Sequence, residues 1–332
     1  MPAESLLSIR NFTIEYHTRA GDVKAVEDVS FDIRREEILG LVGESGCGKS
    51  TLGKGIMRLH RKPAQITGGE LFFDGRDLMS LSEDEMRMVR GGEIGMVFQD
   101  PMTSLNPVQR IIEHLTETIH AHEPDTSHAE ALKRADKLAE KLGIRAERLK
   151  EYPHQMSGGM RQRVMISLAL ALRTKLVIAD EPTTSLDVIV EAKFLDLLRE
   201  LRHEFGLTIL IITHNIGVVA EVADRVAVMY AGRIMEIGEV HQIFANPQHP
   251  YTRGLLKSVP NIALDDADLY KMEGTPPNLL NSPTGCSFHP RCPSVMKICS
   301  EKIPTLDNVG DDHQAACWLY QTNPNSAEVK NG

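Results

Sequence analysis

Residues 38–56 read ILGLVGESGCGKSTLGKGI, and they narrow the choice of fold more than any other segment. The apolar start, Ile38–Val42, predicts a buried strand, and a helix-compatible segment begins near Lys49. The eight residues from Gly43 to Ser50 fit the pattern G-x-x-x-x-G-K-[ST] of a phosphate-binding loop, or P-loop. A glycine-rich turn with a chance lysine is the alternative, but the flanking strand and helix favour the P-loop.

This loop predicts how a nucleotide is held. Its glycines let the backbone curl so that successive N–H groups point at phosphate oxygens, and the following helix adds its positive dipole end. We expect Lys49 to reach the β- and γ-phosphates and Ser50 to bind Mg²⁺. Cys47 lies inside the loop and is not expected to bind a metal. The residues predicted to surround the phosphates are Gly43, Glu44, Ser45, Gly46, Cys47, Gly48, Lys49, Ser50 and Thr51.

A second acidic element follows another apolar run. Leu176–Ala179 predicts a buried strand that ends in the adjacent acids Asp180 and Glu181. Asp180 would hold Mg²⁺ directly or through water, and Glu181 would act as general base toward the attacking water. Two solvated loop carboxylates are the alternative. The P-loop in the same chain favours a hydrolytic site.

Charge and hydropathy exclude several classes of protein. The 332 residues carry a formal net charge of −9, which argues against nucleic-acid binding because phosphate contacts require a basic surface. The N-terminus lacks the charged and apolar regions of a secretory signal. The apolar runs are shorter than the roughly 18 residues needed to span a membrane. We therefore expect a soluble protein in a reducing compartment.

The segment MSGGMRQR, residues 156–163, lies between the two nucleotide elements. Together with Gln99, Asp187 and His214, it makes residues 5–240 resemble the ATP-binding cassette (ABC) ATPases. The resemblance implies an α/β P-loop NTPase core with an antiparallel β layer and an inserted helical subdomain at about residues 100–170. It divides the chain into an ATPase domain, residues 1–240, and a C-terminal extension, residues 241–332.

In that family two subunits close on ATP, so the working unit is a dimer with two interfacial sites. The resemblance implies that Ser157, Gly158 and Gly159 complete the site of the other subunit from a helix N-terminus. It also implies one role for each of four single residues: Tyr16 stacks on adenine, Gln99 senses the γ-phosphate and Mg²⁺, Asp187 crosses the interface, and His214 grips the γ-phosphate. The alternatives are a cross-strand aromatic at Tyr16 and a structural histidine at position 214. Two departures from the family pattern are Met156 in place of leucine and Asn215 in place of aspartate.

Several further elements are predicted around the site. Residues 8–16 and 25–33 read as an antiparallel layer, and residues 68–75 read as another strand of the nucleotide core. Residues 108–142 read as two helices joined by the turn-rich residues 122–128. Further helices are expected over residues 160–173 and over residues 191–201, where an apolar stripe recurs with helical spacing.

A finer resemblance is to the ATPase subunits of oligopeptide and dipeptide permeases. It is carried by four segments: FQDPMTSLNP, residues 98–107; YPHQMSGGMRQRVMIS, residues 152–167; ADEPTTSLDV, residues 179–188; and HPYTRGLL, residues 249–256. It implies an importer subunit on the cytoplasmic face of the membrane, paired with a second ABC ATPase beneath two permeases and served indirectly by a solute-binding protein. Importers of oligosaccharides or nickel, a non-transport cytosolic ABC ATPase and a catalytically silent docking scaffold are the alternatives.

Four of the five cysteines lie near the C-terminus with the spacing Cys286-x5-Cys292-x6-Cys299-x17-Cys317. Four thiolates suit either tetrahedral zinc or an iron–sulfur cluster. Zinc sites favour pairs two to four residues apart, and the wider spacing favours a larger group. The family resemblance implies a [4Fe–4S] cluster, with zinc and four free thiols as alternatives. Because residues 260–283 are proline-rich and poor in apolar runs, we expect such a group to staple this tail.

Overall fold

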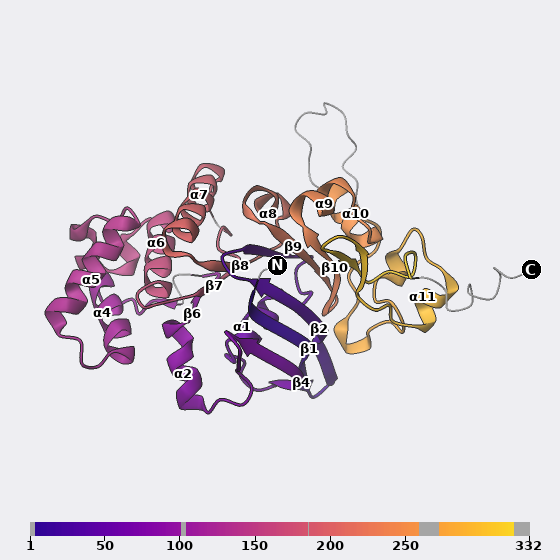
Figure 1. Ribbon diagram of the computed structural model, residues 1–332, viewed down its shortest axis with the longest axis horizontal. Coiled ribbons are helices and arrows are strands. Elements are labelled where there is room, and N and C mark those ends of the chain that lie inside the picture. The colour runs from indigo at the N-terminus through magenta and orange to yellow at the C-terminus, as the bar shows by residue number, and fades with distance from the viewer. Residues whose placement is uncertain (1–3, 101–103, 185, 259–271, 322–332) are drawn as a thin grey trace, which may run out of the picture. The chain divides into compact units, whose positions relative to one another are not determined.

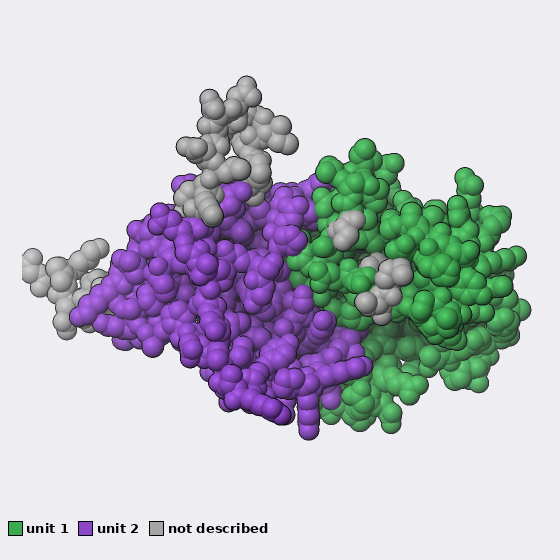
Figure 2. All heavy atoms as spheres, turned by 180° about the vertical axis from the view of Figure 1, so that it is seen from behind, with its two compact units in different colours: residues 1–8, 32–39, 70–213 green, residues 9–31, 40–69, 214–332 purple. Residues whose placement is uncertain are grey.

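The computed structural model describes residues 4–100, 104–184, 186–258 and 272–321 (Figure 1). The chain forms two compact units (Figure 2). Unit 1 contains residues 1–8, 32–39 and 70–213, and unit 2 contains residues 9–31, 40–69 and 214–332. None of the helices in the described ranges has both the length and the apolar character that crossing a bilayer requires.

Unit 1 contains three parallel strands in the order β6 (Ile94–Val97), β7 (Leu176–Asp180) and β8 (Thr208–Thr213). Every residue of these strands is buried. Continuous apolar runs of this kind are typical of parallel strands covered on both faces. The register pairs Asp180 with Ile212, so the acidic end of β7 lies beside the end of β8.

The described residues of unit 1 include the helices α2 (Glu83–Gly92), α4 (Ile111–His122), α5 (His128–Lys141), α6 (Gly158–Ala169) and α7 (Val188–Phe205). Two 3₁₀ turns, η1 (Ala146–Lys150) and η2 (Pro153–Gln155), precede α6. Helices α4, α5 and α6 pack on one another (Figure 1). The predicted helix pair within residues 108–142 is confirmed by α4 and α5. The helix expected over residues 160–173 ends earlier, at Ala169.

A four-stranded sheet has the order β2 (Gly21–Arg34), β1 (Ser5–Thr18), β4 (Ala64–Phe73) and β5 (Arg76–Asp77). Only two residues separate β1 from β2, so these neighbours form an antiparallel hairpin, as the sequence predicts. The prediction that residues 68–75 add a strand to the nucleotide core is wrong, because β4 pairs with β1 and β5. The two glycines at the centre of β4 therefore belong to this four-stranded sheet.

Unit 2 also contains strands in the order β11 (Asp307–Gly310), β12 (His313–Ala315), β10 (Arg233–Glu239), β9 (Arg225–Tyr230) and β3 (Ile38–Val42), whose first two residues fall in unit 1. The β9–β10, β10–β12 and β11–β12 pairs are antiparallel. The helices are α1 (Lys49–Ile56), α8 (Ile216–Val222), α9 (Val240–Ala245), α10 (Pro250–Lys257) and α11 (Lys297–Glu301). The described part of this unit also contains two 3₁₀ turns, η3 (Leu279–Asn281) and η4 (His289–Arg291).

The glycine at position 40 allows β3 and α8 to pack closely. A Cβ at Gly40 would lie 2.3 Å from Cγ1 of Val219, which is far below van der Waals contact. A side chain at position 40 would therefore force the helix and the strand apart, and overpacking of this kind typically costs about 1–3 kcal/mol.

We expect Gly40→Ala to lower the free energy of unfolding by about 1–3 kcal/mol. Combining it with Val219→Ala should recover part of the loss. Gly68→Ala is the matched control, since a Cβ there meets no atom within 4 Å. Urea denaturation measures all three variants. Equal stabilities of the Gly40 and Gly68 variants would contradict the close packing.

Candidate nucleotide site and cysteine cluster

The P-loop backbone takes a course that only glycine permits. Gly48 ends the loop with φ +107°, and a Cβ there would lie 2.0 Å from the carbonyl oxygen of Ala25. A Cβ at Gly43 would lie 2.1 Å from the carbonyl oxygen of Met229. The loop therefore passes between β2 and the end of β9 with no room for side chains at its two outer glycines.

Lys49 begins α1 and is 5% exposed. Its ammonium group donates hydrogen bonds to the carbonyl oxygens of Gly43, at 2.7 Å, and Glu44, at 3.1 Å. The side chain therefore folds back over the loop, which holds a positive charge within the turn. Burial raises the pKa of the neighbouring Cys47 thiol, which keeps this cysteine protonated at neutral pH.

Tyr16 lies beside the start of α1. Its hydroxyl is 3.3 Å from Oγ1 of Thr51, and its side chain is partly exposed. The structure therefore brings together Tyr16 and the P-loop, two elements that the sequence predicts for one site. Stacking of the ring on adenine stays a prediction.

His214 and Asn215 lie between β8 and α8, and both are exposed. Oδ1 of Asn215 accepts a hydrogen bond of 3.0 Å from the N–H of Gly217, so this residue caps α8. Asparagine and aspartate cap helices equally well. The departure from the family pattern at this position therefore preserves the helix start. The role of His214 at the γ-phosphate stays a prediction.

The acidic pair lies at the end of β7 in unit 1. Asp180 and Glu181 are both buried. Glu181 has φ +50°, an uncommon conformation for a residue other than glycine, and its N–H donates to the carbonyl of Ile212 at 2.8 Å. Its carboxylate accepts a 3.0 Å hydrogen bond from Oγ1 of Thr184. This contact orients the side chain that the sequence predicts as general base.

The SGG segment forms the N-terminus of α6. Oγ of Ser157 accepts from the N–H of Met160, and Gly158 and Gly159 occupy the first turn. Within unit 1, Nε2 of the buried Gln162 donates to the carbonyl of Pro182, which follows the acidic pair. Helix α6 is therefore joined directly to the segment that follows the acidic pair, a contact that sequence reasoning did not predict.

Two other predicted residues of unit 1 lie at the ends of elements. Asp187 caps α7, with Oδ1 3.0 Å from the N–H of Val190. Gln99 is exposed and lies two residues beyond β6. Asp187 therefore has a local structural role in addition to its predicted role at an interface. The predicted roles of both residues toward nucleotide remain predictions.

The four C-terminal cysteines are free thiols that share one neighbourhood. Cys286, Cys299 and Cys317 are each 8% exposed, and Cys292 is partly exposed. Burial, together with the other cysteines, raises the pKa of both Cys286 and Cys317 to about 11. The N–H of Cys286 donates to the carbonyl of Cys299 at 2.7 Å, which closes the loop between them. The predicted convergence of these thiols is therefore present.

The thiols are more widely spaced than zinc ligands. Among the described residues, no three of the cysteine sulfurs lie within 4.8 Å of one another. Zinc–sulfur bonds of about 2.3 Å in a tetrahedron would place all four sulfurs about 3.8 Å apart. The four thiols therefore do not form a preassembled tetrahedral zinc site.

Buried polar contacts anchor α10 and β12 to strand β10 of unit 2. The carboxylate of Glu236, on β10, accepts from the N–H of His249 at 2.9 Å and lies 2.7 Å from Nε2 of His313. His249 caps α10 by accepting from the N–H of Tyr251, and burial lowers the pKa of its imidazole to about 4. The imidazole of His249 is therefore neutral at physiological pH. Glu236 joins α10 and β12 to the same strand.

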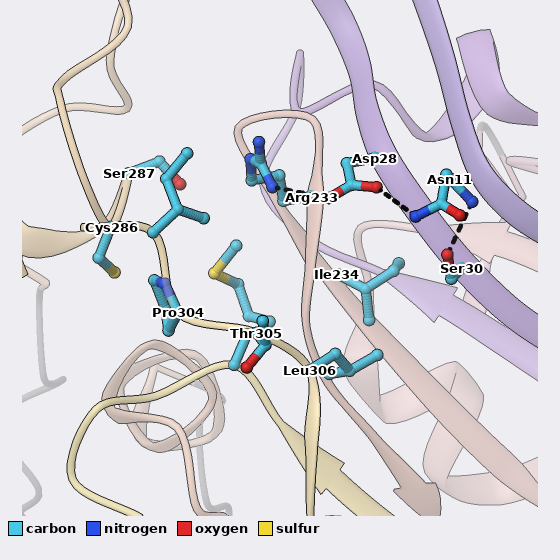
Figure 3. Close-up of a pocket in the computed structure, with 13 residues that line it drawn as sticks. Asn11, Asp28, Ser30, Arg233, Ile234, Cys286, Ser287, Pro304, Thr305 and Leu306 are labelled. Carbon is cyan, nitrogen blue, oxygen red and sulfur yellow. Dashed lines mark hydrogen bonds and ion pairs between the residues drawn. The ribbon is translucent and has the colours of Figure 1, made fainter. Parts of the chain in front are cut away.

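A separate cavity of about 410 Å³ lies beside Cys286 and Ser287 (Figure 3). Its polar side is occupied by Arg233, which pairs with Glu27 at 3.1 Å. Oγ of Ser287 is buried and has no hydrogen-bond partner among the described residues. Of the residues that the sequence predicts for function, only Cys286 lines this cavity.

Comparisons with known proteins decide the family. Residues 26–184 match the model described as ABC transporter, and residues 235–299 match the model described as oligopeptide/dipeptide transporter, C-terminal region. The dipeptide transport ATP-binding protein DppD of Bacillus subtilis is 46% identical over 319 residues, which cover 95% of each chain. This chain belongs to the ABC transporter ATP-binding subunits. The oligopeptide transport ATP-binding protein OppD of Salmonella typhimurium is also 46% identical, over 96% of this chain and 94% of the relative.

A solved structure supports the ABC ATPase core. The dimeric structure of a bacterial ABC transporter cassette matches 70% of this chain and 98% of its own, with a TM-score of 0.64 and 29% identity. The same cassette is also known in a post-hydrolysis state with ADP and phosphate. The chain is therefore an ABC-type ATPase, and the predicted P-loop fold is confirmed.

We expect Gly48→Ala to weaken ATP binding by this ABC ATPase by at least about tenfold, because the methyl group collides with the Ala25 carbonyl and the backbone is strained. Gly46→Ala is the comparison, since its φ of +80° imposes strain but a Cβ meets no protein atom within 4 Å. Titration with a fluorescent ATP analogue measures both dissociation constants. A Gly48 variant that binds as tightly as the Gly46 variant would contradict the steric account.

Proposed function

We propose that this chain is the ATP-hydrolysing subunit of an importer of dipeptides or oligopeptides. The observation that carries the proposal is the C-terminal match to peptide transporters, joined to an ATPase core in a chain that aligns with peptide-transport relatives along nearly its whole length. ATP binding and hydrolysis would drive solute through membrane permeases. Residues 1–240 would form the ATPase domain, and residues 241–332 would form the peptide-permease type extension.

In the proposed cycle, two ATPase subunits enclose two ATP molecules. Tyr16 stacks on adenine, and the P-loop with Lys49 binds the triphosphate. Ser157–Gly159 and Asp187 of the opposite subunit complete each site. Support comes from the position of Ser157 at the start of α6, where the helix dipole favours an anionic γ-phosphate.

The hydrolytic step would use the acidic end of β7. Ser50, Gln99 and Asp180 would hold Mg²⁺, which neutralises phosphate charge when it is bound. Glu181 would take a proton from water as the water oxygen bonds to the γ-phosphorus. The bond between the γ-phosphorus and the β,γ-bridging oxygen then breaks and ADP leaves, while His214 would bind the γ-phosphate. The hydrogen bond from Thr184 supports this orientation of the base.

The proposed partners are a second ABC ATPase, identical or related, and two membrane-spanning permease subunits, beneath which this chain would lie on the cytoplasmic face of the membrane. An extracytoplasmic solute-binding protein would act indirectly, and no nucleic-acid partner is proposed. Uptake of labelled peptides by membranes that contain the full transporter tests the solute. Uptake of oligosaccharide or nickel, or full activity without permeases, would favour the alternative functions.

We also propose that the four C-terminal thiolates hold a [4Fe–4S] cluster that staples the extension. Support comes from their shared neighbourhood and from a sequence spacing wider than that of paired zinc ligands. Because burial raises the pKa of Cys286 and Cys317, metal binding would release protons from these groups.

We expect Glu181→Gln to bind ATP while turnover falls by about 100-fold or more, because the amide cannot accept the proton from water. Glu200→Gln, an exposed change on α7, should hydrolyse ATP normally. Phosphate release under saturating ATP measures both variants. If the Glu181 variant turned over at the wild-type rate, the general-base assignment would be wrong.

We expect anaerobically purified wild-type protein to contain about four iron and four sulfide ions per chain. Replacing Cys286, Cys292, Cys299 and Cys317 by serine should abolish both. Cys47→Ser is the matched control, because this fifth thiol lies in the P-loop, and it should keep the metal. Elemental analysis and visible absorbance distinguish the outcomes. One zinc ion per chain, or no metal at all, would refute the cluster.

A further inference from the structure

We propose that Arg291 is a positioning residue of the phosphate-binding loop, and that it makes ATP affinity depend on the order of the cysteine segment, residues 286–299. The inference rests on the proposed role of the P-loop as the ATP site. Arg291 lies on η4, between Cys286 and Cys292, and is separated in sequence from the loop by more than 240 residues.

The contact between the two segments is a bidentate ion pair. Nη1 of Arg291 lies 2.7 Å from Oε2 of Glu44, and Nη2 lies 3.0 Å from Oε1. The side chain of Arg291 is 6% exposed, and that of Glu44 is 25% exposed. A partly buried, bidentate arginine–carboxylate pair fixes geometry better than a surface pair between flexible side chains does.

Every polar group of Glu44 has a partner. Its N–H donates to the hydroxyl of Tyr251 at 3.0 Å, and its carbonyl accepts from Lys49. Its carboxylate is held by Arg291. Two of these three contacts therefore come from residues in the C-terminal part of the chain, and they hold the first turn of the P-loop from outside.

Aromatic packing keeps Arg291 in place. The guanidinium lies 5.7 Å from the ring centre of Tyr230 and 5.9 Å from that of Phe288, and it donates to the Tyr230 hydroxyl at 3.2 Å. Tyr230 and Tyr251 pack with ring centres 4.6 Å apart, and Phe288 contacts both rings. The carbonyl of Glu273 accepts from Nε of Arg291. These contacts fix the position of the Arg291 guanidinium independently of its ion pair with Glu44.

Backbone hydrogen bonds also connect Arg291 to the turn that carries Cys286 and Cys292. The N–H of His289 donates to the carbonyl of Cys286 at 2.9 Å, and the N–H of Arg291 donates to that of Phe288 at 3.0 Å. The N–H of Cys292 donates to the carbonyl of His289 at 3.3 Å. These bonds make one compact turn from Cys286 to Cys292. A change in how the two thiols are held therefore displaces Arg291.

The negative charge of Glu44 explains why its ion pair with Arg291 affects nucleotide binding. Glu44 places a carboxylate in a loop predicted to bind a polyanion, and like charges repel. Arg291 neutralises that carboxylate through the bidentate ion pair. Without Arg291, the P-loop would keep a negative charge and lose an external support. Both effects weaken binding of the triphosphate.

Full-length protein is titrated with a fluorescent ATP analogue, well below the melting temperature of each variant. We expect Arg291→Ala to raise the dissociation constant about tenfold, as loss of a hydrogen-bonded charge pair commonly does. Arg291→Lys should give an intermediate value, because lysine keeps the charge without the fork. Lys297→Ala, in the same segment and 92% exposed, is the control and should bind like wild type.

Two further sets of variants separate the effect of the Glu44 charge from the effect of order in the cysteine segment. Adding Glu44→Gln to Arg291→Ala should recover part of the affinity, because it removes the uncompensated carboxylate. Replacing Cys286 and Cys292 together by serine should also raise the dissociation constant, and adding Arg291→Ala should have little further effect. If Arg291→Ala does not fold, Arg291→Lys and Tyr251→Phe provide the same test through the two contacts on Glu44.

Unchanged affinity in the Arg291 variants would overturn the inference and leave the proposed function intact. Independent, additive effects of the cysteine and arginine changes would overturn the coupling. Failure of the wild-type chain to bind ATP at all would instead refute the proposed function. For variants assembled with permeases, a raised KM with little change in kcat is expected, because the support acts on ground-state and transition-state binding alike.

Discussion

The ATP site of this protein depends on the hydrogen bonds that a tightly curled backbone can donate to phosphate. They require the chain to leave β3, turn through Gly43–Gly48 and enter α1 at Lys49. The carbonyl groups of Ala25 and Met229 lie so close to this path that side chains are excluded at both outer glycines. The surrounding strands therefore shape the loop as much as its own sequence does.

The C-terminal part of the chain adds a second layer of support. Tyr251 and Arg291 contact the backbone and side chain of Glu44, although they lie more than 200 residues away in sequence. Glu236 holds α10 and β12 to β10 through buried hydrogen bonds. The cysteine segment is thus part of the environment of the phosphate loop and is joined to it by specific polar contacts.

Sequence reasoning succeeded where a local pattern determines the structure. Strand β3 has the predicted bounds, and β7 extends one residue further, because buried parallel strands are continuous apolar runs. The grouping of Tyr16 with the P-loop and the convergence of the four cysteines were also predicted. The sheet of β4 was assigned wrongly, because an isolated strand does not reveal its partner. The contacts of Arg291 and Gln162 were missed, since each joins segments whose proximity only the folded chain determines.

The central claim is that the loop recognises a triphosphate through its backbone and Lys49. Equilibrium binding of ATP, ADP and AMP to the full-length chain with Mg²⁺ tests it most directly, because the three ligands share the adenosine and differ only in phosphates. The account predicts that ATP and ADP bind far more tightly than AMP and that Lys49→Ala removes this difference. Equal affinity for all three nucleotides would contradict it.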